Sequence, residues 1–370
     1  MLEIKNQKAI LKIIVLSILL FLSNFTLMIT NVSSIGYQVS FEEIAHIEST
    51  GGDTFMNQVL GDLVIVMDMN AGLKIYDISD PVNPILLDSF YDGGIPHQFF
   101  IDEDLLYLAD HYNGLEIYNI SVPNNIQKIG QIVDTGDGET DGVFVNNNVA
   151  YTAEWHDSTW DWKMVLIDVS DPTNIVDYVD SDNEFVRFYV EDDICYTACL
   201  QSGFKILNVS NPMSITEISH FEDLNYCFNF QFNNNLVYLA DGRGFNILDV
   251  NDITNPTRIG KYNSTLYDVK VKDNLAFAAE DVKGIIALNI TNVDDIKKIG
   301  EFEVEDVVGI DVSDNYLYLS LHGHGFKIVK YEIIESTDEA SLPNSLIIIL
   351  VIGLMACTAR IIKKFSFKKH

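Results

Sequence analysis

The chain has 370 residues, with 23 Lys and Arg residues against 54 Asp and Glu residues, and a net charge of -31 at pH 7. A chain this acidic lacks the basic surface on which nucleic-acid binding generally depends. Hydrophobic residues make up 48% of the chain and aromatic residues 11%, which is enough for a core and excludes intrinsic disorder. The four cysteines exclude a small fold held together by disulfides.

The N-terminus combines basic residues with an apolar run. Lys5, Lys8 and Lys12 precede residues 13–30, which are mostly apolar and carry no charge. This order is typical of a secretory signal peptide or a signal anchor. We therefore expect residues 1–34 to form one of these two segments, with Ser34 suited to a cleavage site.

A second apolar run, residues 346–362, lies near the C-terminus. Seventeen residues in a helix span about 26 Å, enough for the core of a bilayer. The tail at 363–370 is basic, which predicts that it is cytoplasmic. We expect a transmembrane helix here, preceded by a polar stalk at 334–345, with residues 35–340 outside the cell.

The acidity belongs to the middle of the chain. Residues 1–30 hold three basic residues and one acidic residue, and residues 341–370 hold five basic residues and no acidic one. Residues 31–340 therefore keep 15 basic and 53 acidic residues, a net charge of -38. This asymmetry agrees with the predicted orientation in a cell membrane, as either a single-pass protein or a signal-cleaved C-terminal anchor.

A six-residue motif recurs seven times between the two apolar runs. It begins as Leu63–Asp68 (LVIVMD), and its copies start 39 to 45 residues apart. The copies begin at Leu63, Leu105, Val149, Ile194, Leu236, Leu275 and Tyr316. A regular step of about 42 residues is typical of a repeat fold.

Each copy contains four segments that are typical of strands. The motif is followed by a glycine-led segment such as Gly72–Asp77, in which apolar and polar residues alternate with the period of a half-buried strand. A turn rich in Asp, Asn and Pro comes next, a third strand-like segment follows it, and a fourth precedes the next copy. Four strands in about 42 residues indicate a blade of a β-propeller, so we predict an all-β, seven-bladed β-propeller over residues 37–333.

The seventh copy lacks a fourth strand. Residues 41–47 have the same apolar spacing as the fourth strands of the other copies, for example residues 296–302. We therefore expect this N-terminal strand to pair with the third strand of the last blade. The pairing closes the ring and removes an exposed sheet edge.

The segments Leu63–Asp68 and Gly72–Pro81 resemble the LVIVD repeat, a family of bacterial and archaeal surface propellers. The resemblance extends over residues 54–330, and the last copy departs most because it has no Asp-x-Ser-Asp-Pro turn. It implies a β-propeller at the cell surface. It implies no common chemistry for the family.

Carboxylates end the motif in five of the seven copies. We expect these side chains to accept hydrogen bonds within their own turns, and the alternative is a charged ring that attracts cations or a basic partner. They are Asp68, Asp110, Glu154, Asp241 and Glu280.

A tryptophan-rich connection in the third copy is the first candidate for partner binding. It contains Trp155, His156, Trp160 and Trp162, and aromatic residues in loops on a rigid scaffold often bind partners. Asp141 is expected nearby. The alternative is that these tryptophans only cover the rim of the blade.

Histidines gather at the same end of the repeats. His97, His111 and Asp110 join the candidate partner-binding residues, and no cofactor is expected. His322 and His324 are candidates for a divalent metal site, although surface histidines without a ligand are the commoner case.

These observations favour a binding or adhesion module, with a surface protein or a glycan as its partner, over an enzyme. The alternative is an extracellular hydrolase or lyase at the axial mouth of the propeller, with His97, His111, Asp110 and Asp141 as acid–base groups. That alternative requires these side chains to converge. A structural component of the cell envelope is a third interpretation.

Overall fold

The computed structural model describes residues 36–49, 53–133, 138–156, 161–171, 176–182, 185–211, 214–224, 226–280 and 283–336. The expected signal segment at 1–34, the transmembrane helix at 346–362 and the basic tail lie outside these residues, as does Trp160. Within them, no helix has the length and apolar character needed to cross a membrane.

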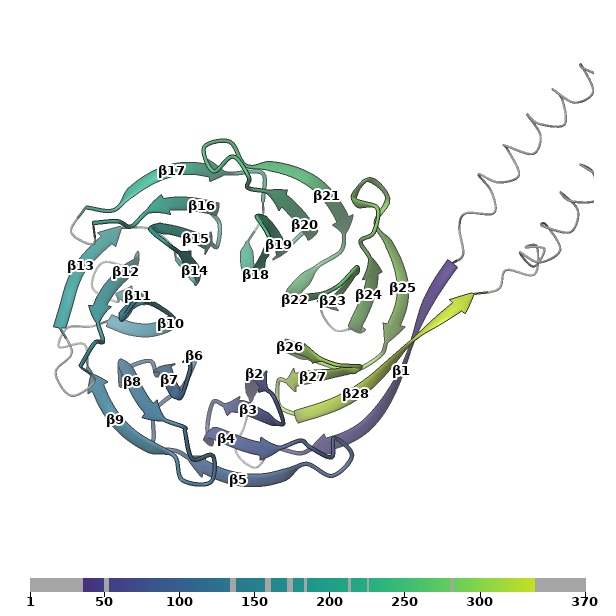
Figure 1. Ribbon diagram of the computed structural model, residues 1–370, viewed down its shortest axis with the longest axis horizontal. Coiled ribbons are helices and arrows are strands. Elements are labelled where there is room, and N and C mark those ends of the chain that lie inside the picture. The colour runs from purple at the N-terminus through teal and green to yellow at the C-terminus, as the bar shows by residue number, and fades with distance from the viewer. Residues whose placement is uncertain are drawn as a thin grey trace, which may run out of the picture. The chain divides into compact units, whose positions relative to one another are not determined.

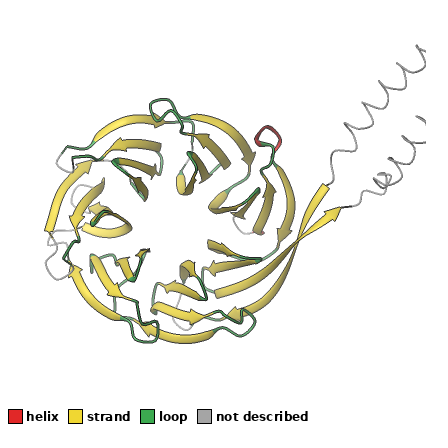
Figure 2. Ribbon diagram, in the orientation of Figure 1, coloured by secondary structure: helices red, strands yellow, loops and turns green. Residues whose placement is uncertain are grey.

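The described strands form seven four-stranded sheets arranged around a central axis, as expected for a seven-bladed propeller (Figure 1). Neighbouring strands of the first sheet are antiparallel, and there the chain moves from the axis outward through consecutive strands. Figure 2 shows that nearly all regular structure is strand, with one short 3₁₀ helix, η2 (Val293–Asp295), among the described residues.

We call the four strands of a blade A to D from the axis outward. The A strands are β2 (Thr54–Leu60), β6 (Gln98–Asp102), β10 (Gly138–Asn146), β14 (Arg187–Glu191), β18 (Cys227–Asn233), β22 (Leu266–Lys272) and β26 (Val307–Ser313). The B strands are β3 (Leu63–Asp68), β7 (Leu105–Ala109), β11 (Val149–His156), β15 (Ile194–Cys199), β19 (Leu236–Asp241), β23 (Leu275–Glu280) and β27 (Tyr316–Leu321).

The outer half of each blade consists of strands C and D. The C strands are β4 (Gly72–Asp77), β8 (Leu115–Asn119), β12 (Asp161–Asp168), β16 (Gly203–Asn208), β20 (Gly244–Asp249), β24 (Gly284–Asn289) and β28 (Gly325–Ser336). The D strands are β5 (Ile85–Phe90), β9 (Gln127–Ile132), β13 (Val176–Asp182), β17 (Thr216–Phe221), β21 (Thr257–Asn263), β25 (Lys297–Phe302) and β1 (Gly36–Ile47).

Backbone geometry explains the glycine that recurs at the start of strand C. Gly72 has φ of 71°, in the left-handed region where glycine is favoured. A Cβ at this position would also overlap the carbonyl oxygen of Phe90 in strand D. Glycine is therefore required both by the turn and by the close approach of the outer strand.

The N-terminal strand closes the ring, as predicted. The last sheet has the order β1-β28-β27-β26, so β1 supplies the missing outer strand. The ammonium group of Lys327 lies 2.8 Å from Oε2 of Glu43, and the ring of His46 contacts the carbonyl of His324 at 2.8 Å. One boundary differs, because β28 continues through Ser336 and takes in the first three residues of the expected stalk.

The hydrophobic core lies between the blades. In the described residues there are seven clusters of buried apolar side chains, and each joins two neighbouring blades. This explains why strand B is apolar up to its last residue in blades such as the first, because both of its faces pack against other blades. The arrangement leaves polar side chains to the axis and the turns.

Candidate functional site at the mouth of the central channel

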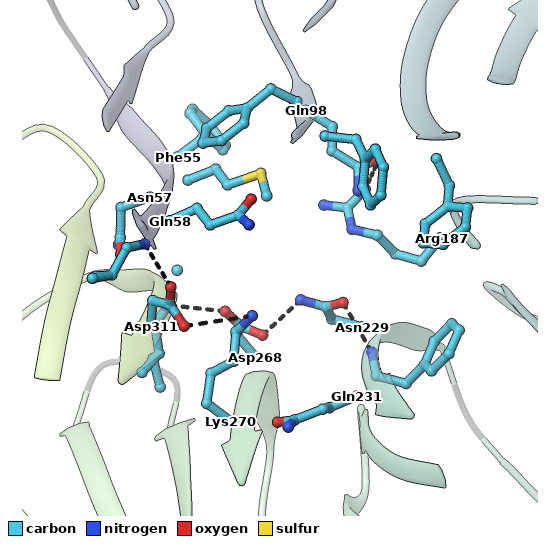
Figure 3. Close-up of a pocket in the computed structure, with 18 of the residues that line it drawn as sticks. Phe55, Asn57, Gln58, Gln98, Arg187, Asn229, Gln231, Asp268, Lys270 and Asp311 are labelled. Carbon is cyan, nitrogen blue, oxygen red and sulfur yellow. Dashed lines mark hydrogen bonds and ion pairs between the residues drawn. The ribbon is translucent and has the colours of Figure 1, made fainter. Parts of the chain in front are cut away.

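The seven A strands surround a cavity of about 510 Å³ on the axis (Figure 3). One residue of each A strand stands opposite the third residue of the strand-B motif, as Phe100 stands opposite Tyr107 and Asp311 opposite Tyr318. Together these residues form one layer of the channel wall. The layer comprises Gln58, Phe100, Phe144, Tyr189, Gln231, Lys270 and Asp311.

One side of this wall is aromatic. The ring centroids of Phe100 and Phe144 lie 4.5 Å apart, and those of Phe144 and Tyr189 lie 5.6 Å apart. Tyr189 stacks on Phe232 at 4.5 Å. The aromatic side therefore extends from the second blade to the fifth.

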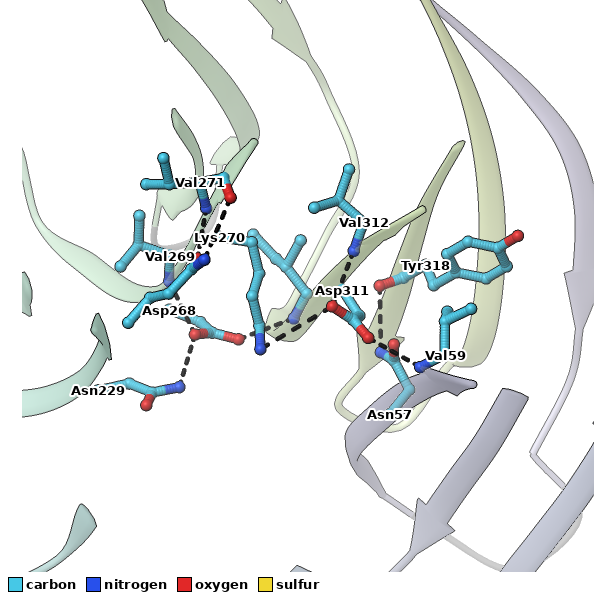
Figure 4. Close-up of polar contacts among 12 residues, drawn as sticks. Asn57, Val59, Asn229, Asp268, Val269, Lys270, Val271, Asp311, Val312 and Tyr318 are labelled. Carbon is cyan, nitrogen blue, oxygen red and sulfur yellow. Dashed lines mark hydrogen bonds and ion pairs between the residues drawn. The ribbon is translucent and has the colours of Figure 1, made fainter. Parts of the chain in front are cut away.

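The opposite side of the wall is polar and links neighbouring blades (Figure 4). Asp268 is buried and accepts hydrogen bonds from the backbone N–H groups of Val269 and Ile310 and from the side chain of Asn229, so it connects three blades. Burial raises the pKa of this carboxyl, while the charge of Lys270 and the backbone hydrogen bonds act in the opposite direction.

Asp311 makes the next link around the ring. It accepts from the backbone N–H of Val59 in the first blade at 2.7 Å and from Val312 at 2.9 Å. The ammonium group of Lys270 lies 3.9 Å from Oδ1 of Asp311, the oxygen that accepts from Val312. The charged groups of this wall thus hold the ring together, which leaves little of their bonding capacity for a ligand.

Arg187 projects toward the channel from the start of strand β14 (Figure 3). Its Nη1 donates to Oε1 of Gln98 at 3.3 Å and to the carbonyl of Val186 at 2.9 Å. Burial lowers the pKa of Arg187, and the charges of Asp268 and Asp141 act in the opposite direction. A guanidinium remains charged in such surroundings, so it places one positive charge at the neck of the channel.

A second cavity of about 330 Å³ forms the mouth of the channel, on the face where the A strands begin. We call it the mouth cavity. Its wall combines aromatic rings from several blades with a few polar groups, the combination found in many ligand sites. The lining residues used below are Trp162, Phe228, Tyr267, His97, Asp141 and Arg187.

His97, His111 and Asp141 converge at one side of the mouth cavity. Nδ1 of His97 lies 2.6 Å from Oδ1 of Asp141 in the neighbouring blade. The rings of His97 and His111 are 4.9 Å apart, and Nε2 of His111 lies 3.1 Å from Oε2 of Glu139. The convergence that the enzyme alternative requires is therefore present for these three side chains.

Three backbone irregularities position this cluster. His111 has φ of 46°, an uncommon conformation for a residue with a side chain. Its backbone pairs with Thr140 of the next blade through two hydrogen bonds of 3.0 and 3.1 Å. Asp141 is the extra residue of a β-bulge between Thr140 and Gly142, and such bulges re-aim side chains near functional sites.

Asp110 lies beside this cluster but has structural partners. It is buried, accepts a hydrogen bond from the side chain of Asn113 at 2.9 Å and packs against the backbone of Gly94. Burial raises its pKa. Asp92 and Glu116 lie close enough to share an ion with it, but the ammonium of Lys128 already pairs with both of these carboxylates.

The other carboxylates at the end of strand B mostly bond locally. Asp68 accepts from the backbone N–H of Asn70, and Asp241 accepts from that of Arg243, as the turn interpretation predicts. Asp68 also accepts from the hydroxyl of Ser49, and Glu280 from that of Ser264. Glu154 differs, because its partners are the hydroxyl of Thr152 and the ring of His156.

The tryptophan-rich connection proves shorter than expected. Strand β11 continues through His156 and strand β12 begins at Asp161, so Trp155 and Trp162 belong to strands. They stand directly opposite each other with ring centroids 5.5 Å apart, a cross-strand aromatic pair that stabilises the extended hairpin. Of the described tryptophans, Trp162 lines the mouth cavity.

His322 and His324 point to different carboxylates. His322 lies 3.3 Å from Asp53, and His324 lies 3.8 Å from Asp306. Both side chains are 52% exposed. The geometry therefore gives the two histidines separate acidic partners.

Sequence reasoning missed several residues of the mouth and the channel. Arg187, Phe228, Tyr267 and Asp268 were not singled out, and neither was the contact of Glu139 with His111. A signal was available, because Arg187 and Asp268 place charges near the start of their inner strands. Only the three-dimensional arrangement shows which of these charges face the axis.

Seven four-stranded sheets, the last completed by the N-terminal strand, define a seven-bladed β-propeller, a rigid scaffold suited to protein interaction. A model of the LVIVD repeat matches residues 51–92, 137–177 and 232–264. The chain therefore contains LVIVD repeats within a seven-bladed β-propeller. No curated protein matches it.

Solved structures agree on the fold. The chain is similar to the computationally designed Ika8 protein, with a TM-score of 0.58 and 10% identity over 78% of this chain and 99% of that one. It is also similar to the Cps50 (Swd1) β-propeller domain of Myceliophteria thermophila, with a TM-score of 0.63 and 10% identity over 79% of this chain and 99% of that one. At this identity the likeness concerns the fold alone.

Proposed function

We propose that this protein is a cell-surface binding module, held at a membrane by residues 346–362, whose partner inserts a basic group into the mouth cavity. The observation that carries the proposal is the composition of this cavity. Trp162, Phe228 and Tyr267 surround it, and Asp141 contributes a carboxylate to its wall. Aromatic faces beside a carboxylate suit a lysine or arginine side chain, which gains both a cation–π contact and an ion pair.

The charge of the chain supports the same class of partner. A net charge of -31 attracts a basic partner over a long range and speeds its association. Arg187 limits how deep the basic group can go, since its guanidinium occupies the neck below the mouth. The partner is therefore a surface protein that presents a basic segment, and its specificity comes from the aromatic rim.

The test uses the full-length chain in a mild detergent, because both ends contain apolar runs. Binding is measured by biolayer interferometry to three immobilised peptides of equal length, which are rich in lysine and arginine, rich in glutamate, or neutral. We expect binding to the basic peptide alone, with an affinity that falls as sodium chloride is raised from 50 to 300 mM.

A matched pair of variants locates the contact. Trp162→Ala should weaken binding to the basic peptide by at least 10-fold. Tyr91→Ala removes an aromatic residue that is 50% exposed but outside the lining of the mouth cavity, and should leave binding unchanged. Equal affinity for all three peptides, or binding to uncharged glycans on an array instead, would contradict the proposal.

The convergence of His97, His111 and Asp141 favours a second candidate function, that of a hydrolase or a lyase. An imidazole paired with a carboxylate can act as a general base. A screen of chromogenic ester, phosphate and glycoside substrates, together with uronate-containing polymers for lyase activity, tests this candidate. Activity must disappear in His97→Gln and persist in His322→Ala. Equal turnover by both variants would show that the reaction does not take place at His97.

A further inference from the structure

We propose that His97, His111 and Asp141 bind a divalent transition-metal ion at the wall of the mouth cavity, and that Glu139 orients His111 for this role. Each of the three residues offers a ligand atom, and these atoms all lie within 4.8 Å of one another. Ligands around a single ion at about 2.1 Å are roughly 3 to 3.5 Å apart, so small side-chain rotations complete the site.

The ligand set decides the class of ion. Two imidazoles and one carboxylate suit zinc and the metals near it, whereas calcium and magnesium take oxygen ligands. Three protein ligands leave at least one coordination position open. Since His97 and Asp141 both line the mouth cavity, that position is accessible from the cavity.

Glu139 supplies the support that metal-binding histidines usually have. Its Oε2 lies 3.1 Å from Nε2 of His111, and a carboxylate on one imidazole nitrogen fixes the orientation of the ring toward a metal. The side chains of His111 and Glu139 are 14% and 12% exposed, so their contact is largely shielded from water.

The backbone is organised around the same residues. The left-handed conformation of His111, its paired hydrogen bonds to Thr140 and the bulge at Asp141 all occur within this cluster. Such uncommon conformations persist only where the surrounding structure holds them, and they concentrate at functional sites. Simple surface ion pairs between histidine and carboxylate need none of them.

The charges near the cluster favour a cation. Asp110 and Glu139 add carboxylates to that of Asp141, and Arg187 is the opposing charge. Nη1 of Arg187 donates to Gln98 and to the carbonyl of Val186, and these bonds hold the guanidinium toward the neck of the channel.

Cobalt is the probe for the test. The full-length chain without an affinity tag is treated with a chelator, kept in mild detergent and titrated with Co²⁺ while its visible absorption is recorded. We expect one equivalent of Co²⁺ per chain and its displacement by Zn²⁺. His97→Gln and His111→Asn should each weaken the affinity by more than 10-fold, and Glu139→Gln by about 10 to 100-fold.

Two choices keep the result decisive. Asparagine replaces His111 because it tolerates a positive φ, and circular dichroism verifies that each variant is folded. The double variant His322→Ala, His324→Ala removes the other histidine pair and should bind Co²⁺ like the wild type. The proposal fails if the wild type binds no Co²⁺ at 1 mM, if His97→Gln binds as tightly as the wild type, or if only the double variant loses binding.

Both proposals use the carboxylate of Asp141, so the peptide assay is run with a chelator and the Co²⁺ titration without a partner, which tests the two separately. Loss of basic-peptide binding with intact Co²⁺ binding would contradict the proposed function alone. The opposite pattern would contradict the metal site alone.

Discussion

Asn57 in the first blade donates a hydrogen bond from Nδ2 to Oγ of Ser320 in the last blade, at 2.8 Å and 263 residues further along the chain. The same nitrogen lies 3.1 Å from the carbonyl oxygen of Tyr318. Both contacts are buried, and they join strand A of the first blade to strand B of the seventh. The first and last blades are therefore joined near the axis, in addition to the closure by β1 at the outer edge of the last blade.

Asn57→Ala should lower the free energy of unfolding by about 1 to 3 kcal/mol, because it leaves two buried acceptors without this donor. Urea denaturation followed by tryptophan fluorescence measures the change. Asn125→Ala is the control, since Asn125 is exposed and its side chain accepts a hydrogen bond from that of Gln127, which is exposed too, and it should change stability by less than about 0.5 kcal/mol. Equal effects of the two substitutions would show that the axial contact does not stabilise the ring.

Deleting residues 37–50 should lower the melting temperature sharply. The deletion exposes the edge of β28 and removes Val39, which is buried in the cluster between the sixth and seventh blades. Val39 also lies close to the backbone of Gly300, where a Cβ would come within 2.5 Å of the carbonyl oxygen of Val39.

Differential scanning calorimetry of the truncated chain tests this closure. A chain that lacks only residues 1–34 is the control and should melt with the full-length protein. A single cooperative transition at an unchanged temperature after deletion of residues 37–50 would be incompatible with closure by the N-terminal strand.

Glu116 makes stability depend on pH in a specific way. Burial raises its pKa to about 7, although the ammonium of Lys128 and the hydroxyl of Tyr118 act in the opposite direction. A carboxyl whose pKa is higher in the folded state binds its proton more tightly there. Its contribution is fully present below its ordinary pKa of about 4.5 and is lost as the pH rises through about 7.

Glu116→Gln removes this dependence. The stability of the variant relative to the wild type should therefore rise between pH 5 and pH 8, by up to about 3 kcal/mol for a shift of this size. Urea midpoints at the two pH values give the difference. Glu217→Gln changes a more exposed carboxylate and should show a much smaller change between the same pH values. A relative stability of Glu116→Gln that is independent of pH would contradict the raised pKa.

The repeat made the fold predictable from the sequence, whereas the candidate site could be predicted only in part. The spacing of the strand-B motifs and the apolar pattern of residues 41–47 were enough to predict seven blades and their closure. The sequence also named His97, His111 and Asp141, but their convergence depends on the bulge at Asp141 and on the left-handed backbone of His111. Neither irregularity can be recognised in the sequence, because neither residue is the glycine that usually indicates a bulge or a positive φ.

The contact between Gly94 and Asp110 gives the last prediction. A Cβ at position 94 would overlap the buried carboxylate of Asp110, so Gly94→Ala should force this side chain out of its position. We expect a loss of about 1 to 3 kcal/mol in the free energy of unfolding, the usual cost of overpacking. Gly93→Ala is the matched control, because Gly93 has φ of 96° but nothing near its Cβ, so it reports backbone strain without the overlap.

A double-mutant cycle separates the overlap from other effects of Gly94→Ala. Asp110→Ala removes the carboxylate, so Gly94→Ala should cost much less in that background than in the wild type, with a coupling of at least about 1 kcal/mol. Gly93→Ala should cost the same in both backgrounds. Additive effects of Gly94→Ala and Asp110→Ala would mean that the two residues do not constrain each other, and that the position of Asp110 beside His97 is not set by the backbone of Gly94.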